Sequence, residues 1–183
     1  RTTESQTHRE MASGLSMPIG FKNGTDGSFS TAINAMQSAS KSHHFLGVND
    51  QGYASIVNTT GNPDGHIVLR GGSKGVNFEN QHVKSISSQL KESNLPHKVM
   101  IDCSHGNSNK DYRKQSDVLN NVANQIRNGE NNILGIMLES HLKEGNQKLT
   151  KRKDLEYGRS ITDACINIET TKTLLSILYD SIL

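Results

Sequence analysis

Tryptophan is absent from this 183-residue chain, and only 4% of its residues are aromatic. Cysteine is also scarce, because Cys103 and Cys165 are the only two and they match no CxxC spacing. This scarcity argues against a disulfide framework and against a zinc site built from thiolates, so we expect two buried thiols. Long apolar runs are missing too, which argues against a membrane-spanning segment.

A large charge of one sign is missing as well, since the formal net charge is only +2. So small an excess does not indicate a nucleic-acid-binding protein. The basic run from Lys148 to Lys153 is a candidate polyanion site, but no aromatic residue is interleaved with it, and Gly145 and Asn146 precede it. A solvated loop is therefore the better interpretation.

The length suits one domain, and the chain starts at Arg1 without an initiator methionine. The sequence does not begin with a positively charged stretch followed by an apolar one, which is the pattern of a secretory leader. We therefore expect residues 1–183 to be part of a single domain that continues in a longer protein, and we expect a cytoplasmic location.

Four short apolar runs, rich in β-branched residues and without alternation, have the pattern of buried parallel strands. Segments with a period of about 3.6 residues separate these runs and predict helices. The predicted strands are Ile19 to Phe21, Ile67 to Leu69, Val99 to Ile101 and Ile133 to Leu138, and the predicted helices are Ser28 to Ser40, Asn80 to Glu92, Asp111 to Asn128 and Ile168 to Leu183. We place helix starts at Asp26 and Thr170 and a helix stop at Gly129.

The alternation predicts an α/β protein with about four βα units, which parallel pairing and right-handed crossovers suit well. Because eight such units close a (β/α)8 TIM barrel, four of them make about half of one. Two further strand-like stretches, His43 to Asn49 and Tyr53 to Thr59, are joined by residues 50–52 and predict a β-hairpin. We interpret this hairpin, at about 43–59, as an insertion with a role in regulation or assembly.

Two cations come directly after apolar runs, at the predicted ends of strands. Lys22 follows Phe21, and Arg70 follows Leu69 and precedes two glycines. Because the carboxyl ends of parallel strands meet at one edge, and glycine allows close backbone approach, the pair predicts a site for a phosphate or carboxylate. The alternative is a pair of ordinary surface bases near loops.

An imidazole and two carboxylates follow the next two strands. His105 comes after the third strand, Glu139 after the fourth, and Asp163 lies on the segment that follows. Mixed nitrogen and oxygen ligands suit a divalent transition metal, which with open positions polarises a carbonyl or activates water. A purely structural His105 is the alternative, and Asp102 is placed to orient its ring.

The motifs of two other enzyme classes are missing. Gly71 and Gly72 do not form GxGxxG, and no GxxxxGK[ST] occurs, so nothing supports a nucleotide-binding fold. Ser104 lacks the flanking GxSxG, so a serine hydrolase is poorly supported.

Six motifs follow one another over the whole chain: RTTESQ from Arg1, GFKNGTDG from Gly20, IVLRGG from Ile67, DCSHGNSNKDY from Asp102, ESHLKEGNQ from Glu139 and SITDACI from Ser160. Together they resemble the C-terminal half of class I 3-deoxy-D-arabino-heptulosonate 7-phosphate (DAHP) synthase. The related synthase that uses arabinose 5-phosphate is a poorer match, because RTTESQ and GFKNGTDG followed by the hairpin point away from it.

The resemblance implies a transferase of the shikimate pathway, the route to the aromatic amino acids. Its reaction is an aldol-like condensation of phosphoenolpyruvate with D-erythrose 4-phosphate, giving DAHP and phosphate. The resemblance further implies a homo-oligomer and a divalent metal ion of the Mn, Fe, Co or Zn type. The residues it assigns are Arg1, Lys22 and Arg70 to phosphoenolpyruvate, His105, Glu139 and Asp163 to the metal, Lys22 and His105 to catalysis, and Asp163 also to substrate.

Parts of the family's site have no counterpart in this sequence. They are a metal-binding cysteine on an early strand, a KPRT-type segment with a catalytic lysine, and one further arginine for phosphoenolpyruvate. Cys103 lies in a strand-end motif and is not a substitute for the missing cysteine. We therefore expect little or no activity from residues 1–183 alone, and an inactive half-barrel fragment with an assembly or regulatory role is the competing interpretation.

By the same resemblance, two regions match the effector pocket of family members that are regulated by feedback inhibition. The candidate effector-binding residues are Leu15, Ser16, Phe45 and Gly47. Glycine at position 47 leaves more room than serine would. We therefore predict that the aromatic amino acid effector is tyrosine, with its extra hydroxyl, rather than phenylalanine.

Overall fold

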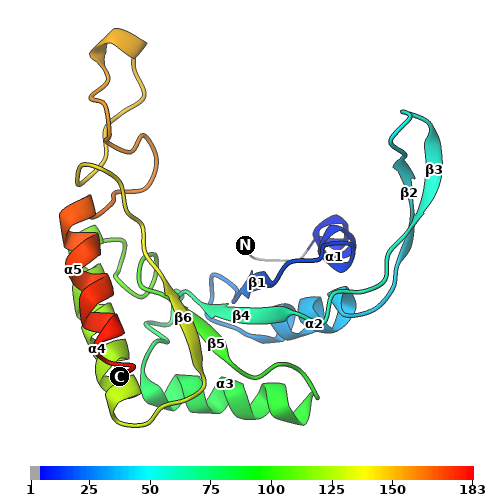
Figure 1. Cartoon of the computed structure of the whole chain (residues 1–183), viewed down its shortest axis with the longest axis horizontal. Coiled ribbons are helices and arrows are strands. Elements are labelled where there is room, and N and C mark those ends of the chain that lie inside the picture. Colours follow the sequence, from blue (N-terminus) through cyan, green and yellow to red (C-terminus); the bar gives the residue numbers. More distant parts are fainter. Residues whose placement is uncertain (1–4) are drawn as a thin grey trace.

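The computed structural model describes residues 5–183 and shows a four-stranded parallel sheet with helices packed against it (Figure 1). The strands lie in the order β1-β4-β5-β6, and each pair of neighbours runs parallel. Their bounds are β1 Ile19–Lys22, β4 Gly65–Leu69, β5 Val99–Asp102 and β6 Ile133–Met137. The four predicted strands and their parallel arrangement are confirmed.

A helix follows each of these four strands, so the chain contains the four βα units that the sequence predicts. Figure 1 shows the sheet curving, with these helices on its convex side. The helices are α1 Gln6–Ser13, α2 Ser30–Ala39, α3 Asn80–Glu92, α4 Gln115–Arg127 and α5 Ile168–Tyr179, with short 3-10 turns at Tyr112–Lys114 and Arg152–Asp154. Helix α1, before the first strand, was not predicted.

The hydrophobic core lies between the convex face of the sheet and the helices. Phe21, Ile67 and Ile101 project from three neighbouring strands, and all are at most 1% exposed. They belong to one buried cluster with apolar residues of the helices, such as Leu119 of α4. Burying a side chain of this size stabilises the fold by roughly 1.5–3 kcal/mol, so this layer holds the strand ends in register.

Both predicted helix starts, Asp26 and Thr170, are wrong, and hydrogen bonds show why. The side chain of Asp26 accepts hydrogen bonds from the Ser28 backbone and hydroxyl, so it closes a turn, and α2 begins only at Ser30. At the last helix, Asn167 is the cap, and its side chain accepts from the backbone N–H of Thr170. The stop at Gly129 is confirmed, because α4 ends two residues earlier and Gly129 has φ +88°.

The predicted hairpin is confirmed as β2 (His44–Val48) paired antiparallel with β3 (Ala54–Asn58). The side chain of Asn49 accepts hydrogen bonds from the Gln51 and Tyr53 N–H groups and so shapes the turn. The hairpin stands away from the sheet in Figure 1, at the right of the view. It is an insertion between α2 and β4, as expected from the sequence.

The edges of the sheet are β1 on one side and β6 on the other. Within residues 5–183 the sheet is therefore open, and its concave face carries the second set of strand side chains. No helix in this described part of the chain combines the length and apolar character that crossing a membrane requires.

Candidate metal and anion site

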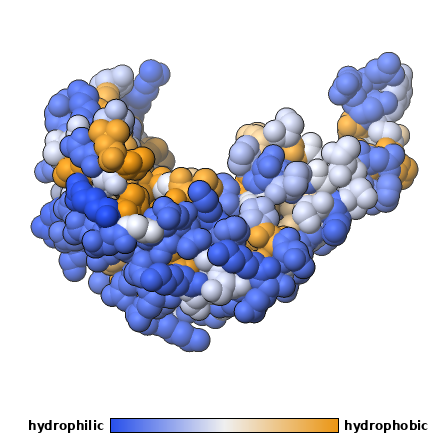
Figure 2. Space-filling view, turned by 60° about the horizontal axis from the view of Figure 1, so that its bottom comes forward, coloured by the Kyte–Doolittle hydropathy of each residue, from blue (hydrophilic) through white to orange (hydrophobic). Residues whose placement is uncertain are grey.

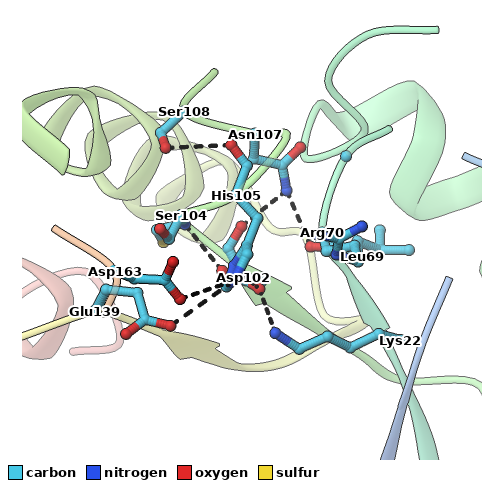
Figure 3. Close-up of polar contacts among 12 residues, drawn as sticks. Lys22, Leu69, Arg70, Asp102, Ser104, His105, Asn107, Ser108, Glu139 and Asp163 are labelled. Atoms are coloured by element: carbon cyan, nitrogen blue, oxygen red, sulfur yellow. Dashed lines mark hydrogen bonds and ion pairs between the residues drawn. The ribbon is translucent and has the colours of Figure 1, made fainter. Parts of the chain in front are cut away.

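The predicted polar residues meet at one edge of the sheet, where the parallel strands end (Figure 3). Lys22 is the last residue of β1, and Asp102 is the last residue of β5. Arg70 follows β4 directly, and Glu139 lies two residues beyond β6. Parallel strands place their carboxyl ends together, which is why residues far apart in sequence form one site.

Asp102 lies at the centre of this arrangement and is fully buried. Its Oδ2 atom is 2.7 Å from Lys22 Nζ and 2.8 Å from His105 Nδ1. The contact with the imidazole is an ion-pair distance rather than an aligned hydrogen bond. The Oδ1 atom accepts a hydrogen bond of 2.9 Å from the Ser104 N–H, which fixes the rotation of the carboxylate. The sequence predicts the contact with His105 but not the ion pair with Lys22.

His105, Glu139 and Asp163 come together on the other side of the imidazole. His105 Nε2 is 3.9 Å from Glu139 Oε1 and 3.8 Å from Asp163 Oδ2. One ligand atom from each residue lies within 4.8 Å of the other two. The two distances from the imidazole are about half an ångström longer than the roughly 3.4 Å expected between two ligands of one ion, so the three side chains would have to draw closer together to hold one. The donor set fits a divalent transition metal.

Glu139 is held from the backbone side by Gln115, the first residue of α4. The buried Gln115 side chain accepts from the Glu139 N–H at 2.8 Å and donates to the Glu139 carbonyl at 3.1 Å. This paired contact fixes the peptide and leaves the carboxylate free to turn toward His105. Nothing in the sequence pattern singles out Gln115, because its role depends on which strand end lies beside α4.

Three buried asparagines connect the loops that carry the site. Asn23 Oδ1 accepts from the Arg70 N–H at 2.8 Å and from Asn77 Nδ2 at 3.1 Å. Asn77 Oδ1 accepts from the Gly71 N–H at 2.7 Å, and its own N–H donates to Asn107 Oδ1. Asn107 Nδ2 in turn donates to the carbonyl oxygens that end β4 and β5. This amide network ties three strand-end loops together, and sequence reasoning missed it.

The Arg70 guanidinium is available to a ligand. Within residues 5–183 no carboxylate forms an ion pair with it. The next residue, Gly71, has φ +69°, and a Cβ there would lie 2.5 Å from the Asn107 backbone nitrogen. Glycine is therefore required next to Arg70, where the loop after β4 closely approaches the loop after β5. Lys22 and Arg70 end neighbouring strands, as predicted.

Both thiols are buried, as predicted. Burial, with a contribution from the Asp102 charge, raises the pKa of Cys103 to about 12. Cys103 also belongs to the core cluster, so it is a protonated core residue and not a replacement for the missing metal-binding cysteine. Burial and the charges of Glu139 and Asp163 raise the pKa of Cys165 as well.

The remaining candidate residues are dispersed. Arg1 lies outside the described residues. Leu15 and Ser16 are exposed just after α1, whereas Phe45 and Gly47 are half-buried in β2. The base of the hairpin does reach the end of α1, because the Ser13 and Thr59 hydroxyls are 2.8 Å apart. The effector pocket stays a prediction.

The fold and the site define an α/β protein that gathers cations and a metal-type donor set at the carboxyl ends of its parallel strands. The chain belongs to the DAHP synthetase I family, whose model matches residues 1–176.

Individual relatives match over nearly the whole chain. The chain is 54% identical over 183 residues to a Tyr-sensitive phospho-2-dehydro-3-deoxyheptonate aldolase of Enterobacter agglomerans, of which it covers 85%. It is 52% identical to the Tyr-sensitive protein of Escherichia coli, covering 51% of it, and 53% identical to that organism's Phe-sensitive protein, covering 52%. These near-equal identities do not separate the two kinds of sensitivity.

A solved structure agrees with this assignment. The phospho-2-dehydro-3-deoxyheptonate aldolase of Francisella tularensis is 48% identical to the chain, with a TM-score of 0.94. All of the chain is matched, but only 53% of that protein. The chain therefore spans about half the length of several relatives that it matches.

Proposed function

We propose that the chain forms part of a DAHP synthase, which condenses phosphoenolpyruvate with D-erythrose 4-phosphate to give DAHP and phosphate. The observation that carries the proposal is that Asp102 contacts both Lys22, one of the two strand-end cations, and His105, which lies beside Glu139 and Asp163. In fold, the four βα units form one half of a (β/α)8 barrel, and the open edges at β1 and β6 are where the other half joins.

The cations bind and orient phosphoenolpyruvate. Arg70 supplies a forked guanidinium for the phosphate or carboxylate, and Lys22 supplies a compact ammonium from the neighbouring strand. The family resemblance assigns Arg1 to phosphoenolpyruvate as well, but Arg1 lies outside the described residues. Held in this way, the enol carbon is directed at the aldehyde of erythrose 4-phosphate, and such orientation lowers the barrier of a two-substrate reaction.

His105, Glu139 and Asp163 would hold a divalent ion of the Mn, Fe, Co or Zn type. Such an ion, when bound, polarises the aldehyde oxygen or activates a water. The protein contributes the arrangement: the imidazole presents Nε2 to the two carboxylates while Nδ1 faces Asp102. Asp163, with its side chain 66% exposed, also lies where an incoming sugar phosphate can contact it.

The effector of this enzyme is an aromatic amino acid, and we favour tyrosine. Relatives named as Tyr-sensitive and relatives named as Phe-sensitive both support feedback inhibition of this kind. Leu15, Ser16, Phe45 and Gly47 form the effector site, and the active protein is a homo-oligomer in which the hairpin contributes to regulation or assembly.

The decisive experiment measures DAHP formation by the native protein from the two substrates, with and without EDTA. We expect activity that EDTA abolishes and that Mn²⁺ or Zn²⁺ restores. Arg70→Ala should raise the KM for phosphoenolpyruvate about tenfold or more and lower turnover, because a charged hydrogen-bonding group is lost. Arg113→Ala is the control, since that arginine is exposed and its ion pair within residues 5–183 is with the nearby Asp111. A native protein without activity, or an unaffected Arg70→Ala variant, contradicts the proposal.

A further inference from the structure

The Asp102 carboxylate uses one oxygen atom for two different functional groups. Its Oδ2 contacts both the Lys22 ammonium and the His105 imidazole, at 2.7 and 2.8 Å. The other oxygen is occupied by the Ser104 N–H, and the residue has no solvent exposure. With both partners in place no water reaches the carboxylate, so a change at one partner alters how much of the negative charge acts on the other.

We propose that Asp102 is a positioning residue that couples the anion site to the metal site. The inference rests on the proposed function, because it assigns Lys22 to the substrate and His105 to the metal. Asp102 holds the ring so that Nε2 faces Glu139 and Asp163, 3.9 and 3.8 Å away. It also fixes the Lys22 ammonium, which makes no other hydrogen bond within residues 5–183 and so has two donors left for an anion.

The sign of the coupling follows from the shared oxygen. The negative charge of Asp102 makes His105 a stronger ligand, as carboxylates behind metal-bound histidines do. Lys22 neutralises part of that charge. When a phosphate or carboxylate of the substrate binds the Lys22 ammonium, the ammonium neutralises less of the Asp102 charge. More of that charge then acts on His105, which holds the metal ion more tightly. By linkage, a bound ion strengthens anion binding by the same factor.

Mn²⁺ affinity, measured without substrate by competition with a fluorescent chelator, tests this in the native protein. Asp102→Asn should weaken Mn²⁺ binding about tenfold to a hundredfold. Lys22→Gln should instead tighten it about fivefold, because the full Asp102 charge then acts on His105. The opposite signs separate the coupling from general damage to the fold, which weakens binding in both variants. Asp154→Asn, an exposed carboxylate in the same protein, is the control and should change nothing.

A double variant distinguishes coupling through Asp102 from direct repulsion between Lys22 and the ion. We expect Lys22→Gln to have no effect in the Asp102→Asn background, as a double-mutant cycle requires for a mediated interaction. An equal tightening in both backgrounds overturns the inference, as does an Asp102→Asn variant whose affinity stays within twofold of the parent. If Asp102→Asn does not fold, Lys22→Gln alone still tests the inference, and unchanged Mn²⁺ binding overturns it.

The result also separates this inference from the proposed function. A native protein that forms DAHP and binds Mn²⁺, but shows no interaction between the two substitutions, contradicts only the coupling. A native protein that binds no Mn²⁺ contradicts the metal site itself and the coupling with it.

Discussion

Neutral amide side chains position the charged residues of the site. Asn23, Asn77 and Asn107 are each at most 5% exposed, and their hydrogen bonds connect the loops after β1, β4 and β5. An amide can donate and accept at once, so a few asparagines satisfy several buried backbone groups without adding charge next to Lys22 and Arg70. The geometry of the proposed anion site therefore depends on neutral asparagines as well as on the two cations.

Asn77→Ala should destabilise the protein by about 1–3 kcal/mol, because the buried Gly71 N–H loses its acceptor. Loss of the loop contact should also raise the KM for phosphoenolpyruvate, since the adjacent Arg70 is no longer fixed. Urea unfolding and steady-state kinetics measure the two effects. Asn124→Ala is the matched control, because that asparagine is exposed on α4. Equal stability of the two variants would show that the amide network is dispensable.

His66 makes the stability of the protein depend on pH. It lies in β4, and burial lowers its pKa from the ordinary value of 6.5. The unfolded chain therefore takes up a proton more readily than the folded chain. The stabilising contribution is fully present above pH 6.5 and is lost as the pH falls toward the lower folded pKa. Urea midpoints should thus decrease between pH 7.5 and 5.5, and His66→Gln should make that decrease smaller.

The control for this prediction is His44→Gln, which replaces an exposed histidine of the hairpin. It should leave the pH dependence of the urea midpoint as it is in the parent protein. If His66→Gln behaves like His44→Gln, burial of His66 does not contribute to acid sensitivity.

At the scale of elements, the hairpin forms a two-stranded sheet of its own, apart from the four-stranded parallel sheet. Its strands β2 and β3 pair only with each other, and alternate residues are exposed along both. Gly47 lies on the less exposed face, where a Cβ would come within 2.5 Å of Val57 Cγ2. A larger residue at this position therefore has to displace Val57 and take up space on that face.

If the hairpin forms the effector site, Gly47→Ser should shift inhibition from tyrosine toward phenylalanine. The added side chain and the displaced Val57 reduce the room for a phenolic hydroxyl. The measurement is the concentration of each amino acid that halves DAHP synthesis. Val48→Ser is the control, because it places the same residue on the opposite, 68% exposed face of β2. A variant with unchanged preference would remove Gly47 from the effector site.

At the scale of the whole molecule, the described chain leaves apolar surface uncovered. Hydrophobic residues gather toward the side that carries α5 and β6 (Figure 2). On these two elements, Leu134 of β6 is 52% exposed, and Leu175 and Tyr179 of α5 are 48% and 64% exposed. Together with the unpaired edges of β1 and β6, this surface favours association with another polypeptide.

The 183-residue polypeptide by itself should therefore self-associate. Sedimentation velocity over a tenfold range of concentration should show a rising mean mass, and Leu175→Lys with Tyr179→Lys should reduce the rise. Lys91→Glu, a charge change at an exposed position of α3, is the control. A polypeptide that stays monomeric over this range contradicts the expectation.

Most secondary structure was predictable because it depends on local pattern. Apolar runs gave the four strands, and the turn residues between His44 and Asn58 gave the hairpin. The helix starts were not predictable at Asp26 and Thr170, because both are good capping types and only the observed hydrogen bonds decide which residue caps. Helix α1 was missed, since its sequence is mostly polar and its last residues are buried by neighbouring elements.

The sequence by itself determined the family, the order of the four parallel strands and of the helices that follow them, and the candidate residues of the site. Lys22, Arg70 and Glu139 were predicted because each follows an apolar run directly, and His105 because it lies in the polar segment after the next run. The tertiary structure alone decided that Lys22 pairs with Asp102, and that Gln115 and the three asparagines hold the loops. These contacts join residues up to 80 positions apart, so their partners depend on strand register, which local pattern does not contain.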